Sequence, residues 1–142
     1  MNKLDINKIN GETSRNIKIG ELSSDVIKAL GLNLKPQDIS VWTPRILEHC
    51  EKHKKEYSSS SAYYNALQSI PQIINEPDFV GMHSNGNISY IKKIDDISLV
   101  GIQILKGSKK NSLLFRTIYP ITADKLNKNI ALGKYIPLKK RG

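Results

Sequence analysis

The sequence FVGMHSNGNISYIKKIDDISLVGIQILKGSKKNSLLFRTIYP, at residues 79–120, decides the fold. Hydrophobic residues recur along it with the period of two that is typical of β-strands. The stretches with this period are residues 79–83, 88–94, 99–105 and 113–119. Asn85-Gly86 is a strong hairpin signal, and Asp95-Asp96 leaves room for a second two-residue turn. The segment therefore predicts four consecutive antiparallel strands.

The residues before this segment have helical signals. One of the two serines at 23–24 provides the N-cap of a short helix that Gly31 ends. Thr43-Pro44 places a hydroxyl N-cap before a proline at the first helical position. This pair predicts a second helix that runs to about residue 55.

A third helical segment has apolar residues at helical spacing, which predicts a stripe facing the core. The stripe consists of Tyr63, Leu67, Ile70 and Ile74. Pro71 either starts a second short helix or kinks the first. We expect Trp42 and Tyr63 to be core residues rather than platforms for base stacking, and Cys50 to be inert packing. Residues 39–42 favour a short extended piece.

The length of 142 residues fits one domain, and the order of the signals predicts an α+β fold. In this fold, N-terminal helices pack on a four-stranded antiparallel β-meander. Residues 1–18 have no helical or strand period, so we expect a flexible lead-in before a domain of residues 19–136. Residues 137–142 are then a basic tail, and a last helical turn or two begins near Thr122.

The net charge of +9 comes from 22 Lys and Arg against 13 Asp and Glu. Residues 92–142 alone contain twelve Lys or Arg and three Asp or Glu. This part of the chain is either a solubilising face with a basic tail or a surface that binds phosphate groups. The single cysteine excludes a disulfide framework and a cysteine-based zinc finger. No apolar run approaches the roughly 18 residues of a membrane span, so no membrane partner is expected.

His49 and His53 are four residues apart, so their rings point to the same side of one helix. The pair suits general acid–base catalysis, because imidazole titrates near neutral pH. It could also bind a metal ion, but no third ligand is evident, or simply make ordinary hydrogen bonds at a helix edge. We expect neither a metal nor a cofactor.

Cations in the predicted strands suit the negative charge that develops on a phosphoryl group during its transfer. Arg116 lies in a strand that otherwise reads as core. The opposite face of that strand is expected to carry Phe115, Thr117 and Tyr119. Lys92 and Lys93 lie on opposite faces of another strand, and Lys93 is expected at a solvated strand end.

Several motifs follow one another along the chain. They are IGELSSDVI at 19–27 with LGL at 30–32, the helix with His49 and His53, IPQIINEPDFV at 70–80, ISYIK at 88–92, LVGI at 99–102 and LFRTIYP at 114–120. In this order and spacing they resemble the phage-associated members of the barnase–EndoU–colicin–RelE-like nuclease superfamily. The resemblance covers about residues 17–135.

The resemblance implies a metal-independent endoribonuclease of toxin type or borne by a phage. Such enzymes cleave RNA by attack of the ribose 2′-hydroxyl on the adjacent phosphate, which gives a cyclic phosphate end. The implied partners are tRNA or another cellular RNA and an acidic immunity or antitoxin protein, and the implied site of action is the cytoplasm. The alternative is a non-catalytic module that binds RNA or a protein through the same basic sheet.

Carried over position by position, the resemblance assigns proton transfer to His49 or His53. Lys92 and Arg116 would stabilise the transition state, and Thr117 would orient a phosphate oxygen. The expected RNA-binding residues are Lys93, Lys106, Lys109, Lys110, Tyr119, Lys139, Lys140 and Arg141. Related sequences often have an acidic residue where Ser89 stands, so a carboxylate base is missing and a histidine would have to serve.

Overall fold

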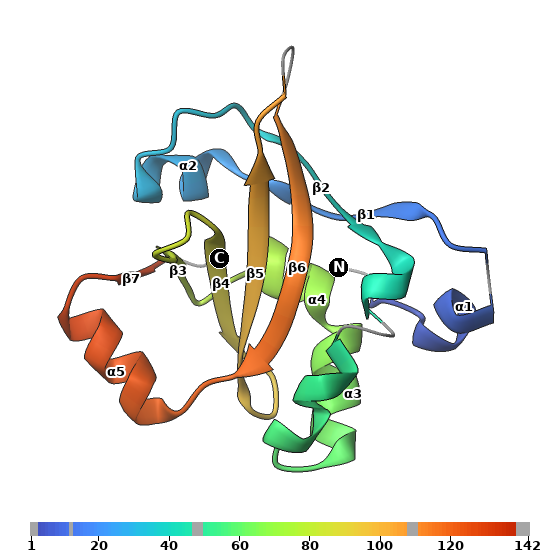
Figure 1. Cartoon of the computed structure of the whole chain (residues 1–142). Helices are drawn as coiled ribbons and strands as arrows, with labels where there is room; N and C mark the ends of the chain where they lie inside the picture. The colour runs from blue at the N-terminus through green and yellow to red at the C-terminus, as the bar shows by residue number, and fades with distance from the viewer. Residues whose placement is uncertain (1–2, 12, 47–49, 108–110, 139–142) are drawn as a thin grey trace.

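The computed structural model describes residues 3–11, 13–46, 50–107 and 111–138, which form one seven-stranded mixed sheet with helices around it (Figure 1). The strands are β1 (Asn16–Leu22), β2 (Gln37–Trp42), β3 (Phe79–Met82), β4 (Ile88–Lys93), β5 (Ile97–Leu105), β6 (Ser112–Pro120) and β7 (Tyr135–Pro137). The helices are α1 (Ile6–Gly11), α2 (Ser24–Leu30), the 3₁₀ helix η2 (Cys50–Glu56), α3 (Ser60–Gln68), α4 (Ile70–Asn75) and α5 (Ala123–Ala131). None of the described helices is long and apolar enough to cross a membrane.

The sheet confirms the predicted α+β class but is larger than the predicted four-stranded meander. Its order is β1-β2-β6-β5-β4-β3-β7. The strands predicted between residues 79 and 119 are β3 to β6, each antiparallel to the next. Beyond them, β7 pairs with β3, and β2 pairs with β6 in parallel. A four-stranded sheet is therefore wrong for this protein, because three further strands, β1, β2 and β7, extend it.

The first 20 residues contain regular structure that the sequence pattern did not predict. Leu4 and Ile9, the latter in α1, are buried in the main core. β1 has a bulge between Lys18 and Gly20, so Ile19 and Leu22 both face the core although they are three residues apart. This irregularity hides the strand period of two. The division of the chain at residues 18 and 136 stays a prediction.

The short helix α2 begins and ends at the predicted caps. The Ser23 hydroxyl accepts a hydrogen bond from the Val26 backbone N–H at 3.2 Å. Gly31 ends the helix with a φ of 63°, a left-handed conformation that glycine adopts at little cost. The helix predicted from Thr43 to about residue 55 is confirmed in part: residues 43–46 are helical, and η2 over residues 50–56 is a 3₁₀ helix.

Two helices cover one face of the sheet, which we call the covered face. α4 packs against β1, β4 and β5, and α3 packs against α4 and η2. Figure 1 shows α4 behind the central strands. Pro71 lies in the first turn of α4, so the proline starts a second short helix. The predicted stripe is confirmed as core, since all four of its residues are buried: Tyr63, Leu67, Ile70 and Ile74.

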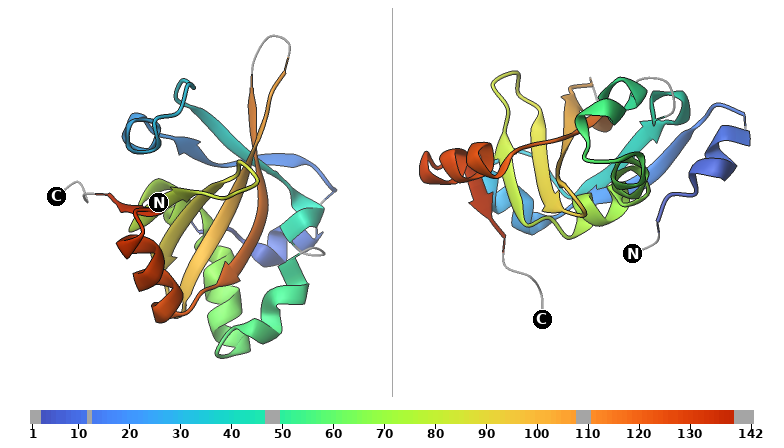
Figure 2. Two further views of the ribbon diagram at one scale, coloured as in Figure 1. Left: turned by 60° about the vertical axis from the view of Figure 1, so that its left-hand side comes forward. Right: turned by 90° about the horizontal axis from the view of Figure 1, so that it is seen from below.

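The other face of the sheet, which we call the open face, is covered mainly at one end. There α5 packs on a small apolar cluster that includes Ile91, Leu99 and Tyr119. Figures 1 and 2 show α5 at one end of the molecule and α1 at the opposite end.

A bulge in β6 decides which of its residues reach the open face. Thr117 pairs with Gly101, but Phe115 already pairs with Ile102, so Arg116 is an extra residue in the strand. Phe115 and Ile118 are both buried in the main core. The sequence-based placement of Phe115 on the same face as Thr117 and Tyr119 is therefore wrong, because alternation shifts by one residue at Arg116.

Candidate active site

His53 is held at the border of the open face by a carboxylate on its own helix. Its Nδ1 contacts the Glu56 Oε2 three residues later in η2. The His53 side chain is 20% exposed. A carboxylate that accepts the Nδ1 proton fixes the ring and leaves Nε2 for proton transfer, which is the arrangement of a base with its orienting group.

Tyr119 brings β6 against this histidine. The ring centroids of His53 and Tyr119 are 5.7 Å apart. On the same ring, the Lys125 Nζ of α5 lies 5.6 Å from the centroid of Tyr119. Burial and the charge of Glu56 raise the pKa of Tyr119, so its hydroxyl stays protonated and can donate a hydrogen bond. We refer to Glu56, His53, Tyr119 and Lys125 as the histidine cluster.

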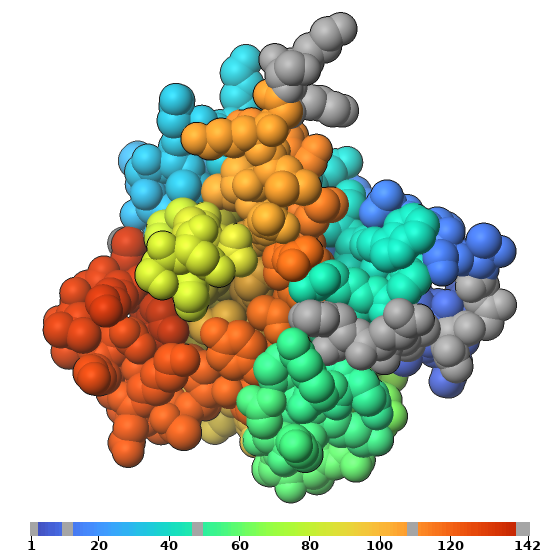
Figure 3. All heavy atoms as spheres, in the orientation of Figure 1, coloured from blue at the N-terminus to red at the C-terminus, as the bar shows by residue number. Residues whose placement is uncertain are grey.

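Beside the histidine cluster, a row of small residues crosses the open face from strand to strand. Gly81, Ser89, Gly101 and Thr117 are consecutive cross-strand partners on β3, β4, β5 and β6. Figure 3 shows the central strands recessed between α5 in red, the β3–β4 hairpin in yellow-green and η2 in green. Thr117 is two residues from Tyr119 on β6, so its hydroxyl lies on the same face as the histidine cluster. Ser89 is only 3% exposed.

Arg116 lies beside a second arginine. The Arg45 Nε donates a hydrogen bond to the Arg116 carbonyl oxygen at 2.7 Å. Burial, and then the positive charge of Arg116, lower the pKa of Arg45. Both arginines line a hollow of about 520 Å³ together with Trp42. Trp42 is 49% exposed, so its assignment to the core is wrong.

Lys92 is not brought together with the other predicted residues. Its Nζ donates a hydrogen bond to the Glu76 carbonyl oxygen at 2.8 Å, at the end of α4, and lies 3.4 Å from the Asp78 Oδ1. These partners place the side chain against the covered face, away from the histidine cluster. A role for Lys92 in stabilising a transition state is therefore at odds with its position. Lys93 is exposed, as expected.

The remaining basic residues are placed only in part. Lys106 is exposed just after β5. The others lie outside the described residues, as does the second predicted histidine: His49, Lys109, Lys110, Lys139, Lys140 and Arg141.

Comparison with protein families identifies the chain. A model of the family described as phage-Barnase-EndoU-ColicinE5/D-RelE like nuclease3, or PBECR3, matches residues 17–128. The chain belongs to the PBECR3 family. No curated protein and no solved structure matches it. The family name describes a nuclease of the barnase–EndoU–colicin–RelE type, which agrees with the resemblance seen in the sequence.

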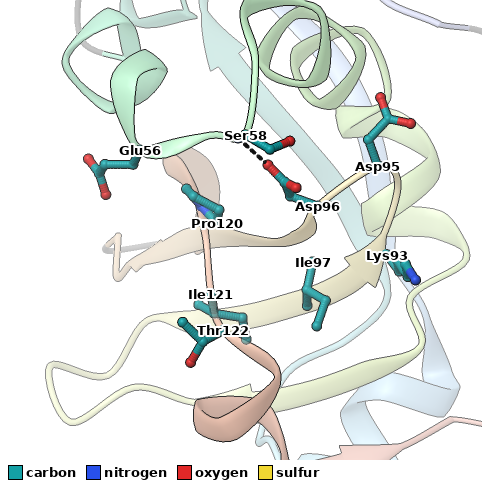
Figure 4. A pocket seen from close by; sticks show the side chains of 9 residues that line it. All are labelled: Glu56, Ser58, Lys93, Asp95, Asp96, Ile97, Pro120, Ile121 and Thr122. Atoms are coloured by element: carbon teal, nitrogen blue, oxygen red, sulfur yellow. Dashed lines mark hydrogen bonds between the residues drawn. The ribbon is translucent and has the colours of Figure 1, made fainter.

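A hollow of about 470 Å³ next to the histidine cluster of this PBECR3 domain is acidic. Its lining includes three acidic residues, Glu56, Asp95 and Asp96, and one basic residue, Lys93 (Figure 4). The Asp96 Oδ2 accepts a hydrogen bond from the Ser58 backbone N–H at 2.8 Å, so this carboxylate holds a turn in place. Three carboxylates repel phosphate groups, so this hollow is unfavourable for a polyanion.

The described residues of this PBECR3 chain offer no candidate metal site. Among them, no group of three or more His, Cys, Asp or Glu residues is arranged to hold a metal ion. His49 is not among those residues.

Three residues of the site were missed in the sequence. Glu56 could have been found, because it stands three residues after His53 at the spacing of a helical pair. Lys125 and Arg45 carry no such signal, since they reach Tyr119 and Arg116 only through the tertiary fold.

Proposed function

We propose that this PBECR3 domain is a metal-independent endoribonuclease. In the proposed reaction, a ribose 2′-oxygen attacks the adjacent phosphorus and loses its proton to a base. The bond from phosphorus to the 5′-oxygen breaks, and that oxygen takes up a proton. The products are a 2′,3′-cyclic phosphate and a 5′-hydroxyl. The observation that carries the proposal is His53, oriented by Glu56 and set against Tyr119 at the border of the open face.

His53 transfers protons in this proposal. Glu56 holds its ring, and the Thr117 hydroxyl orients a phosphate oxygen from the neighbouring row. Arg116 supplies positive charge where negative charge develops on the phosphate. Lys92 takes no part, because it is bound to Glu76 and Asp78 on the covered face.

RNA is the proposed substrate because the chain has an excess of positive charge, and this excess lies in residues 92–142. The net charge is +9, and residues 92–142 hold twelve of the 22 Lys and Arg. This charge attracts any polyanion, but attack by a 2′-hydroxyl requires ribose. An oligonucleotide with one deoxyribose at the cut position should therefore resist cleavage there.

Incubation with RNA in EDTA, followed by mapping of the cut ends, tests the proposal. We expect 2′,3′-cyclic phosphate ends, and a loss of rate on the order of 10²–10⁴-fold in His53→Ala. His83→Ala is the matched control, because His83 is an exposed histidine whose Nδ1 accepts from the Asn85 backbone N–H in the β3–β4 turn. Full activity of a His49→Ala/His53→Ala double variant would refute a role for histidine in proton transfer.

A second candidate function is RNA binding without cleavage. The absence of a carboxylate at position 89 favours it. The resemblance implies an acidic residue at position 89, whereas this chain has a serine there that is almost fully buried. This candidate predicts salt-sensitive RNA binding and no new cyclic phosphate ends.

If the domain is a toxin acting in the cytoplasm, we propose that an acidic immunity or antitoxin protein covers the open face. Rescue of growth on co-expression of such a protein is the observation to seek. An acidic protein that binds but leaves RNA cleavage and growth arrest unchanged would argue against this partner.

A further inference from the structure

The hollow beside β6 adjoins the proposed reaction site through Arg116, but its other lining residues have no role in the proposed reaction. Trp42, Arg45, Arg116 and Asn16 line it, and its volume is about 520 Å³. Its lining residues thus include a tryptophan, two arginines and an asparagine. Within the described residues, no ion pair involves Arg116.

Trp42 is the large aromatic side chain of this hollow, and half of it faces solvent. It sits at the end of β2, where its backbone neighbour across the strand pair is Asn16 of β1. An indole ring is usually well buried, because exposing it forfeits a large gain from the hydrophobic effect. A half-exposed indole on a wall of a basic hollow is suited to stacking on a flat ligand.

The two arginines are held close to each other. The Arg45 Nε is fixed on the Arg116 carbonyl oxygen at 2.7 Å, which limits the positions available to its guanidinium. The charge of Arg116 contributes to lowering the pKa of Arg45, as expected for neighbouring like charges. An anion placed between them would relieve this repulsion, and phosphate matches the hydrogen-bonding geometry of guanidinium groups.

We propose that Trp42, Arg45 and Arg116 form a subsite for one nucleotide of single-stranded RNA, with the base stacked on the indole and the phosphate bound by the arginines. Stacking on an aromatic ring accepts any base, so the subsite supplies affinity without reading sequence. Arg116 and Thr117 are adjacent on β6, so an RNA chain held here continues toward the histidine cluster. The subsite rests on the proposed RNA substrate.

Trp42 is the single tryptophan of the chain, so its fluorescence reports the subsite directly. The experiment titrates a short, unstructured oligoribonucleotide into the His53→Ala variant, which keeps the RNA intact. We expect quenching of the tryptophan emission as RNA binds. Trp42→Phe, studied with a labelled oligonucleotide, should keep most of the affinity, whereas Trp42→Ala should lose on the order of 5–100-fold.

Two further variants separate stacking from general charge. Arg45→Gln should weaken binding and reduce the slope of log affinity against log salt by about 0.7, the value for one phosphate of a single strand. Tyr64→Ala is the matched control, because Tyr64 is 39% exposed and has the Lys54 Nζ 4.9 Å from its ring centroid, away from this hollow. That variant should bind RNA as the parent does.

Equal RNA affinity in Trp42→Ala and its parent would overturn the subsite. Equal quenching by polyglutamate would do so as well, since the hollow would then serve an acidic polypeptide. The result is independent of catalysis, because binding is measured in a variant that need not cut. A wild-type protein that fails to cleave RNA refutes the proposed function, while quenching and Trp42 dependence would still support the subsite.

Discussion

The two faces of the sheet use the same strands for different purposes. On β6, Phe115 and Ile118 face the covered face and belong to the main core, whereas Thr117 and Tyr119 face the open one. The covered face is filled by apolar side chains from α3 and α4. The open face keeps a row of small residues bordered by His53 and Arg116. One bulged strand can therefore anchor the fold and present polar groups in adjacent positions.

Two consecutive lysines of β4 repeat this contrast. Lys92 is 7% exposed and bound at the end of α4, while Lys93 is exposed. Identical side chains thus serve the fold on one face and remain in solvent on the other. The sequence predicts a solvated strand end for Lys93, which is confirmed, and a transition-state role for Lys92, which its position does not favour.

The largest effect is expected on the covered face, from Phe115→Ala. Removing this buried ring leaves a cavity and should lower the free energy of unfolding by about 3–5 kcal/mol. Urea unfolding measures the loss. Burial raises the pKa of the Cys50 thiol to about 12, so this thiol should react with a thiol reagent only when the chain unfolds, which gives a second readout. A drop below about 1 kcal/mol would mean that Phe115 is not a core residue.

On the border of the open face, Glu56→Gln should affect rate and not stability. The amide holds the His53 ring less firmly, and misplacing a catalytic group costs on the order of 10²-fold in rate. RNA cleavage under single-turnover conditions measures this loss. Unchanged cleavage in a folded Glu56→Gln variant would remove the orienting role of the carboxylate.

The lysine pair gives a direct comparison of the faces. Lys92→Met should lower the free energy of unfolding by about 1–3 kcal/mol, because it removes the hydrogen bond to the Glu76 carbonyl and the contact with Asp78. Lys93→Met should stay within about 0.5 kcal/mol of the parent. Both should cleave RNA at the parent's maximal rate below their unfolding transitions. A rate loss in Lys92→Met without a loss of stability would restore its catalytic role.

The smallest effect is expected from Thr117→Val, which keeps the shape and removes the hydroxyl. Loss of one neutral hydrogen bond to a phosphate oxygen should slow cleavage by about 2–10-fold. Thermal unfolding should change little. A rate equal to that of the parent would refute the proposed role of the Thr117 hydroxyl in orienting a phosphate oxygen.

Much of the fold could be predicted because its signals are local. Asn85-Gly86 marks the β3–β4 turn, where Gly86 has a φ of 90°, and Gly31 ends α2. The missed strands depend on distant partners. β7 is three residues long and is defined by its pairing with β3.

The site was predicted less completely for the same reason. His53 was found from its residue type, but the Arg116 bulge cannot be read from a strand with an apparently regular pattern. Trp42 is expected in the core from its residue type, but its side chain is half exposed. It is the last residue of β2 and lines a hollow with Arg45, and neither fact has a local signature in the sequence.

The parallel pairing of β2 with β6 joins two strands that are far apart in the sequence. Ile39 and Leu113 are neighbours in the sheet, although most of the domain lies between them in the sequence. The β1–β2 pair can form early during synthesis, but its inner edge has no partner until β6 has been made. Such non-local pairing is a slow step of folding. The hollow between Trp42 and Arg116 does not exist before that step, so the proposed subsite is absent from an unfinished chain.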